Sequence, residues 1–170
     1  HALMEEQIVN RVANSKLLTI DLEEFYPTGK RYQVDISQWL TEGIFLKEKD
    51  FRQHIKSNNW SIYKEAYVAI HCATDAIIPA WAFMLITSEI SLFAKKVVTG
   101  DLNLLESILF SEVIENLDTE QYLDKSVIIK GCSNKPIPST AYTLLVQKLQ
   151  PIAKSIMYGE ACSSVPIYKR

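Results

Sequence analysis

One pattern occurs twice in this chain and constrains its fold more than any other feature. The first copy is the apolar run YVAIHC (67–72), followed by a loop and Pro79. The second is SVIIKGC (126–132), followed by a loop and Pro138. With one gap allowed, both copies predict a strand, a cysteine, a loop and a helix that begins near the proline. The remaining cysteine, Cys162, also follows an apolar run, so all three cysteines lie just beyond a candidate strand.

From about residue 64 onwards, short β-branched runs alternate with longer helical patterns. This alternation is typical of a parallel α/β sheet covered by helices on both faces, and we expect such a three-layer β-α-β-α-β-α-β core. The predicted strands are 66–71, 95–99, 126–130 and 155–158, and the predicted helices are 79–93, 102–116 and 138–150.

The first third of the chain is less regular. Two alternating runs flank the turn at 26–30 and predict a β-hairpin. We therefore expect one domain, 4–170, in which 4–63 extends the α/β core 64–170, while residues 1–3 resemble a cloning remnant. The predicted elements before the core are a helix at 4–14, strands at 17–22 and 31–36, a short helix through Trp39 and Leu40 capped by Asp35 or Ser37, and a helix at 49–57.

Composition excludes several classes of protein. The chain has 170 residues, 48% hydrophobic and 22% charged, which is ordinary for a globular domain. A net charge of −2 gives no electrostatic reason to bind nucleic acid or an anionic membrane. Because there is neither an apolar run of about 18 residues nor a signal-peptide pattern, we expect a cytoplasmic protein. The odd number of cysteines then favours free thiols or metal ligands over disulfides.

The cysteines converge if the sheet has the common flavodoxin-like order, 95–99, 66–71, 126–130, 155–158. Cys72, Cys132 and Cys162 would then follow three neighbouring strands at their carboxyl ends. Helix amino ends at this edge favour thiolates. Three soft ligands with an open fourth position suit zinc or an iron–sulfur cluster.

The other residues near the cysteines have weaker assignments. Asp75, in the loop after Cys72, could complete a metal site or simply end a turn, and Glu160 is similar. Lys135, after Cys132, could bind an anion or balance thiolate charge, although a solvated loop lysine is the ordinary alternative. The cysteines themselves could be reactive without metal, or inert small hydrophobes.

Six segments resemble an uncharacterised family of small bacterial cytosolic proteins, and together they cover nearly the whole chain from Met4. This family has no established activity, but its genes are often found near those of the Suf iron–sulfur assembly system. The resemblance therefore implies Suf proteins as partners. The segments are IVNRVANS (8–15), LKEKDFR (46–52), CxTDAIxPxWA (72–82), FxEVIENL (110–117), GCSxKP (131–136) and QKLQPxAKSIMYGExC (147–162).

These observations lead to one expected function and two alternatives. The expected function is that of an accessory protein of iron–sulfur metabolism that binds a metal ion or cluster through Cys72, Cys132 and Cys162. The first alternative is a thiol-dependent enzyme or sulfur acceptor that uses Cys72 or Cys132. The second is an interaction module with inert cysteines. Whether the protein is an enzyme, and its oligomeric state, stay open.

Overall fold

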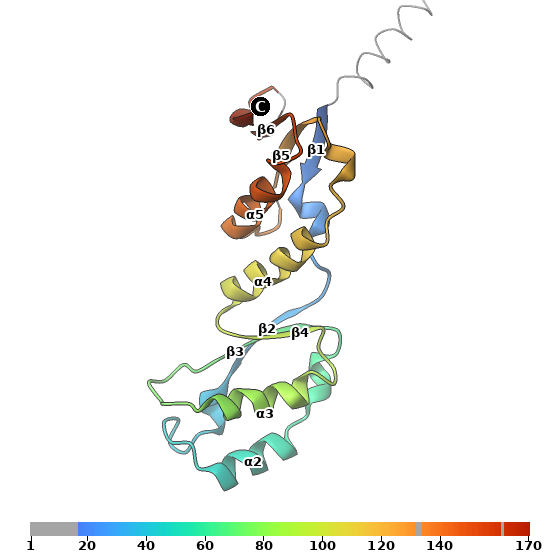
Figure 1. Cartoon of the computed structure of the whole chain (residues 1–170). Helices are drawn as coiled ribbons and strands as arrows, with labels where there is room; N and C mark the ends of the chain where they lie inside the picture. The colour runs from blue at the N-terminus through green and yellow to red at the C-terminus, as the bar shows by residue number, and fades with distance from the viewer. Residues whose placement is uncertain (1–16, 132–133, 161) are drawn as a thin grey trace, which may run out of the picture. The chain divides into compact units, whose positions relative to one another are not determined.

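The computed structural model describes residues 17–131, 134–160 and 162–170 (Figure 1). The predicted helix at 4–14 lies outside these residues. The chain forms two compact units: unit 1 comprises the segment up to Tyr26 together with Leu109–Arg170, and unit 2 comprises Pro27–Ile108. Each unit contains a mainly parallel sheet, so the predicted α/β class is confirmed. No helix in the described part of the chain has the length and apolarity needed to cross a membrane.

Unit 1 is built on a four-stranded sheet with the order β1-β5-β6-β7. The first three strands are parallel, and the C-terminal strand β7 runs antiparallel to β6. The strands are β1 (Leu17–Asp21), β5 (Ser126–Lys130), β6 (Ser155–Tyr158) and β7 (Val165–Lys169). The helices are the 3-10 turns η1 (Leu22–Phe25) and η4 (Glu120–Tyr122), the C-terminal part of α4 (Leu102–Glu115), and α5 (Ser139–Leu149).

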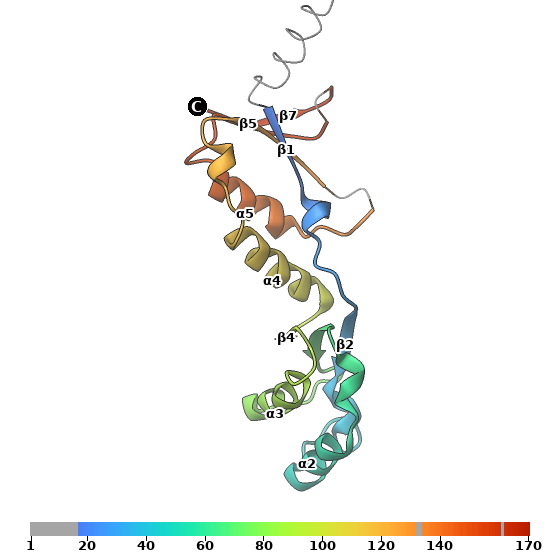
Figure 2. The ribbon, with the colours of Figure 1, turned by 90° about the vertical axis from the view of Figure 1, so that its right-hand side faces the viewer.

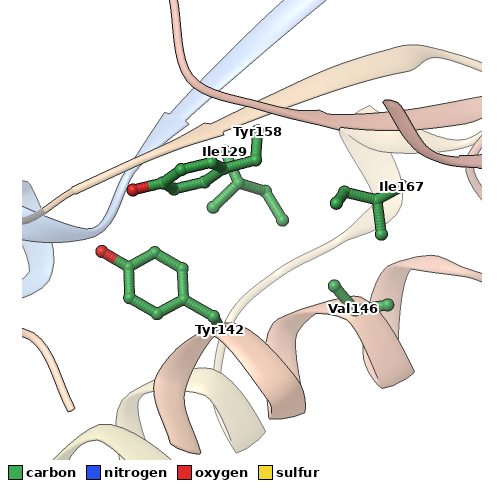
Figure 3. A pocket seen from close by; sticks show the side chains of 5 residues that line it. All are labelled: Ile129, Tyr142, Val146, Tyr158 and Ile167. Atoms are coloured by element: carbon green, nitrogen blue, oxygen red, sulfur yellow. The ribbon is translucent and has the colours of Figure 1, made fainter. Parts of the chain in front are cut away.

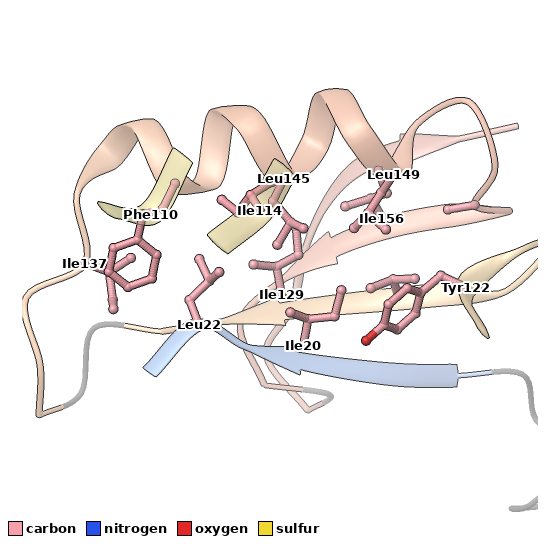
Figure 4. Packing of buried hydrophobic residues seen from close by; sticks show 13 residues of the cluster. Ile20, Leu22, Phe110, Ile114, Tyr122, Ile129, Ile137, Leu145, Leu149 and Ile156 are labelled. Atoms are coloured by element: carbon pink, nitrogen blue, oxygen red, sulfur yellow. The ribbon is translucent and has the colours of Figure 1, made fainter. Parts of the chain in front are cut away.

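The core of unit 1 lies between its sheet and α5, with the end of α4 beside them (Figure 4). The central strand β5 contributes three consecutive buried residues, Val127, Ile128 and Ile129. Burial on both faces is typical of a central parallel strand. From α5, Leu145 and Leu149 point toward the sheet (Figure 4), and Ala141, at the same helical spacing, is buried in the same cluster.

Unit 2 has a three-stranded parallel sheet with the order β2-β3-β4. Its helices α2 and α3 lie side by side in both views (Figures 1 and 2) and share one apolar cluster with the sheet. The strands are β2 (Arg31–Asp35), β3 (Tyr67–His71) and β4 (Lys96–Thr99). The helices are η2 (Ile36–Trp39), α2 (Glu48–Ser57), η3 (Trp60–Tyr63) and α3 (Ala80–Ile90).

The two units repeat the same sequence of elements. In both, a strand and a capped 3-10 turn are followed by a helix, another 3-10 turn, the central strand, a proline-led helix and a third strand. Unit 2 is inserted into unit 1 between η1 and the end of α4. Residue numbers in equivalent pairs differ by 14 before the insertion and by 59 after it. The pairs include Val34 and Ile20, Ile36 and Leu22, Phe51 and Phe110, Ile55 and Ile114, Tyr63 and Tyr122, and Gly100 and Gly159.

Equivalent backbone hydrogen bonds support this register. Gly100 N donates to Ile70 O at 2.9 Å, and Gly159 N donates to Ile129 O at 3.0 Å. The two prolines also match: Pro79 and Pro138 immediately precede α3 and α5, with φ near the usual proline value. The predicted strand ends and helix starts of the doubled pattern are therefore confirmed. The register needs no gap, however, and so Gly131, not Cys132, occupies the position equivalent to Cys72.

The predicted hairpin and the predicted single sheet are both wrong. β1 pairs in parallel with β5, and β2 pairs in parallel with β3, so the two N-terminal strands belong to different sheets. The predicted single sheet placed β3 and β5 next to each other. In the structure, β2 lies beside β3 and β1 lies beside β5. Strands β3 and β5 are thus not neighbours but the centres of two separate sheets.

Candidate functional site

The carboxyl ends of β1, β5 and β6 meet at one edge of the unit 1 sheet, where open α/β sheets usually bind ligands. A small cavity of about 100 Å³ opens there. It is lined by Asp21 from β1, Lys130 and Gly131 from β5, and Tyr158, Gly159 and Glu160 from β6. We refer to it as the edge pocket.

Charge in the edge pocket is dominated by carboxylates. Lys130 Nζ lies 2.9 Å from Glu160 Oε1, and both side chains are partly exposed. The hydrogen bond and charge of Glu160 raise the pKa of Lys130, and the charges of Asp21 and Glu24 act in the same direction. The lining of the edge pocket holds two carboxylates, Asp21 and Glu160, and one ammonium group, and its net charge is negative.

Behind the edge pocket, a second cavity of about 200 Å³ lies between α5 and the strands β5, β6 and β7 (Figure 3). We call it the tyrosine pocket. The rings of Tyr142 and Tyr158 meet edge to face, with centroids 5.7 Å apart at 84°. Tyr158 lines both pockets. The lining residues are Ile129, Tyr142, Val146, Tyr158 and Ile167.

The absence of a side chain at Gly131 allows the hydroxyl end of Tyr142 to approach the end of β5 closely. A Cβ atom on Gly131 would lie 2.6 Å from the Tyr142 hydroxyl oxygen, closer than real contacts allow. Sequence reasoning missed the tyrosine pocket because β7, which supplies Ile167, was not predicted. The run VPIYK contains a proline, which weakens a strand assignment except at a sheet edge, where β7 lies.

Unit 2 has its own arrangement at the carboxyl edge of its sheet. Cys72 follows β3, is half-buried, and its Sγ lies 3.4 Å from Thr74 Oγ1. Thr74 Oγ1 donates to Gly43 O at 2.6 Å. Asp75 lines an adjacent groove of about 520 Å³ together with exposed apolar residues such as Phe45 and Ile77.

Asp35 holds this edge of unit 2 together. Its Oδ1 accepts hydrogen bonds from the backbone N–H groups of Ser37, at 2.9 Å, and of Ala73, at 3.0 Å, while Oδ2 accepts from Ser37 Oγ. Burial acts to raise the pKa of Asp35, but these hydrogen bonds and the charge of His71 outweigh it and lower the pKa. The carboxylate thus caps η2 and anchors the loop that follows Cys72.

The other predicted site residues belong to unit 1. Cys162 is exposed and follows the edge pocket along the chain, and Cys132 lies outside the described residues. Lys135 is exposed, with Nζ 5.4 Å from the centre of the Tyr26 ring, and its backbone N–H donates to Glu23 Oε1. Glu23 thus fixes the start of the loop that carries Lys135.

The observed sheet order does not support the prediction that all three cysteines follow neighbouring strands. Cys132 and Cys162 follow neighbouring strands of one sheet, whereas Cys72 follows the central strand of the other. The strand order that suggested convergence of all three is therefore incorrect. Within the described ranges, no group of three His, Cys, Asp or Glu side chains is arranged to hold a metal ion. A site that includes Cys132 stays a prediction.

Comparisons with known proteins give a family and no function. No curated protein and no solved structure matches the chain. The sequence profile of DUF2480, described as a protein of unknown function, matches residues 6–170. This match covers both units and all three cysteines, and the chain therefore belongs to the DUF2480 family.

Proposed function

We propose that this protein is an accessory factor of iron–sulfur metabolism that binds a thiophilic metal ion or an iron–sulfur cluster through Cys132 and Cys162. The observation that carries the proposal is the parallel pairing of β5 and β6, in which Ile129 lies opposite Tyr158. Neighbouring strands are about 4.8 Å apart. The chain segments that carry the two cysteines thus start from the same edge, three and four residues beyond this pair.

The chemistry of this edge supports a thiolate site. Thiolates are the preferred protein ligands of zinc and of iron–sulfur clusters. Glu160, two residues before Cys162, is a further oxygen ligand within reach of the same edge, provided that it leaves Lys130. Two thiolates and one carboxylate leave a position open for a ligand from a partner, as a transient carrier needs. The resemblance to proteins encoded near the Suf genes suggests Suf assembly proteins as that partner.

The test is metal content after anaerobic purification, measured by elemental analysis and by the visible spectrum. We expect Cys132→Ser and Cys162→Ser each to remove most of the bound metal, and the double variant to add little, because ligands of one ion act together. Cys72→Ser is the matched control and should keep its metal. Equal loss in all three variants would restore the three-cysteine site, and absence of metal from the anaerobic wild type would overturn the proposal.

Cys72 supports a second candidate function, that of a sulfur acceptor. Its thiol is half-buried beside the hydroxyl of Thr74, and the loop that follows it borders the unit 2 groove. In this reaction the Cys72 thiolate attacks the outer sulfur of a persulfide donor, forms a new persulfide, and releases the donor as a thiolate. Incubation with a persulfide donor followed by mass spectrometry should then show a sulfur atom added at Cys72. Its absence from Cys72→Ser, with retention in Cys162→Ser, would confirm the assignment.

A further inference from the structure

We infer that unit 1 carries a binding site for a small amphipathic amine, with its apolar part in the tyrosine pocket and its ammonium group in the edge pocket. The site uses no cysteine and shares only Glu160 with the function proposed above, so amine binding is tested on metal-free protein. Its lining comes from α5 and from three strands of the sheet, and these residues are shown together in Figure 3.

The size and lining of the tyrosine pocket define the apolar part of the ligand. Its volume of about 200 Å³ exceeds the roughly 150 Å³ of an apolar protein cavity that binds benzene. Ile129 is almost fully buried behind it, while Tyr158 and Ile167 are 40% and 50% exposed, so a ligand can enter from solvent. One aromatic ring, or an aliphatic chain of similar volume, fits in this cavity, beside the contacting tyrosine rings and against Val146 and Ile167.

The two tyrosines give the pocket a direction. Their hydroxyl groups lie at the same end, and Val146 and Ile167 lie at the other (Figure 3). The Tyr142 hydroxyl is close to Gly131, which also lines the edge pocket, and Tyr158 borders both cavities. A ligand whose ring occupies the tyrosine pocket therefore directs its polar end toward the edge pocket.

Charge in the edge pocket selects the polar end of the ligand. Asp21 and Glu160 line it, and the ammonium group of Lys130 is already 2.9 Å from Glu160. A ligand carboxylate would meet uncompensated negative charge there, whereas a protonated amine would be attracted to Asp21 and Glu160. Both carboxylates line the cavity itself, so the surplus charge is local.

Comparison with unit 2 indicates that the site is specific to unit 1. The residues equivalent to Val146 and Tyr158 are Thr87 and Thr99, which are smaller and polar. The described part of unit 2 has no strand equivalent to β7 beside β4. The tyrosine pocket is therefore not a general consequence of the repeated fold.

The direct test compares three probes on the full chain by protein-observed NMR titration: 2-phenylethylamine, 3-phenylpropionate and ethanolamine. We expect 2-phenylethylamine to bind at least about tenfold more tightly than 3-phenylpropionate, because the two share a ring but differ in charge. Ethanolamine, which lacks the ring, should show no saturable binding. Equal affinity for the amine and the acid, or shifts confined to unit 2, would overturn the inference.

Variants locate the binding site. Val146→Phe fills the tyrosine pocket and should abolish binding of 2-phenylethylamine, whereas Val165→Phe, the same change at an exposed position of β7 outside the lining, should not. Ile167→Ala removes one wall at a half-exposed position and should weaken binding even if Val146→Phe fails to fold. Unchanged affinity in both pocket variants would refute the site.

The contribution of charge and the independence from metal are tested separately. Glu160→Gln should weaken the binding of 2-phenylethylamine and strengthen the binding of 3-phenylpropionate. An unchanged ratio of the two affinities would exclude the edge pocket as the site of the ammonium group. In metal-free protein, the double variant Cys132→Ser/Cys162→Ser should bind 2-phenylethylamine as the wild type does. Loss of amine binding in that variant would show that the amine site requires the cysteines, and would overturn this inference. Loss of metal without loss of amine binding would bear only on the proposed function.

Discussion

Units 1 and 2 share their order of elements but differ at the carboxyl edges of their sheets. In both, a phenylalanine and an isoleucine from a helix are fully or almost fully buried, and a capping aspartate ends the first strand. At the edge, by contrast, Cys72 of unit 2 corresponds to Gly131 of unit 1, and only unit 1 has β7 in the described residues. The repeated core can be regarded as a scaffold, and the edges as the places where the units acquired separate chemistry.

The strongest test of this equivalence removes the same core side chain from each unit. Phe51 and Phe110 are both 0% exposed, so Phe51→Ala and Phe110→Ala should each destabilise their unit by about 3–5 kcal/mol. All three tryptophans, Trp39, Trp60 and Trp81, lie in unit 2, so tryptophan fluorescence reports its unfolding. Hydrogen exchange of the β5 backbone amides reports the unfolding of unit 1. If one of the two substitutions lowered the free energy of unfolding by less than about 1 kcal/mol, the two phenylalanines would not have equivalent roles.

A second test concerns the ion pairs that differ between the units. Arg31 of unit 2 donates to both carboxylate oxygens of Glu106, with Nε 2.6 Å from Oε1, and these side chains are 12% and 13% exposed. Glu106→Gln should cost about 1–3 kcal/mol, because Arg31 would lose its charged partner in a mostly buried place while it keeps its hydrogen bonds to Pro27 O and Gly29 O. The pair of Arg170 and Asp124 in unit 1 is exposed. Asp124→Asn should therefore leave the urea midpoint unchanged at high salt, and a large shift there would contradict this difference.

A third test concerns the position at which the units differ most clearly. Gly131→Ala should destabilise unit 1 by about 1–3 kcal/mol, because the added methyl group overlaps the Tyr142 hydroxyl. Tyr142→Phe removes that oxygen and should recover part of the loss, which a double-mutant cycle measures as coupling. At the equivalent position of unit 2, Cys72→Ala should show no coupling with Phe83→Leu. Additive effects of the two unit 1 changes would exclude the proposed overlap.

The smallest expected effect concerns the capping aspartates. Asp35→Ala should cost about 0.5–2 kcal/mol near neutral pH, because it removes the η2 cap and the anchor of Ala73. Since the folded pKa lies below the ordinary value of 3.8, this stabilisation is complete above that value and is lost as the pH falls through the folded pKa. The difference between wild type and variant should therefore shrink below about pH 4. Urea unfolding at pH 6 and pH 3 measures it, and a difference that grows in acid would contradict the assignment.

Local features near the candidate sites could be predicted, but the grouping of residues into pockets could not. Local patterns place Cys72 beyond a strand and both prolines at helix starts, and the structure confirms this. They also leave two candidate caps, Asp35 and Ser37, of which the structure selects Asp35. The tyrosine pocket could not be predicted, because it needs β7 beside β6 and the Tyr142 ring against Gly131. These contacts join residues from three separate segments, and no periodicity within one segment reports them.

The sequence by itself determined where most strands and helices lie, with β7 as an exception, because hydrophobic period, caps and prolines act over a few residues. Only the tertiary structure decided which strands pair. The alternating runs of β1 and β2 suit a hairpin as well as two parallel edge strands, since a single strand carries no record of its neighbour. Their partners β5 and β3 lie far along the chain, and the choice depends on which apolar faces the helices of each unit can cover. That choice assigns the strand before Cys72 to one sheet and the strands before Cys132 and Cys162 to the other.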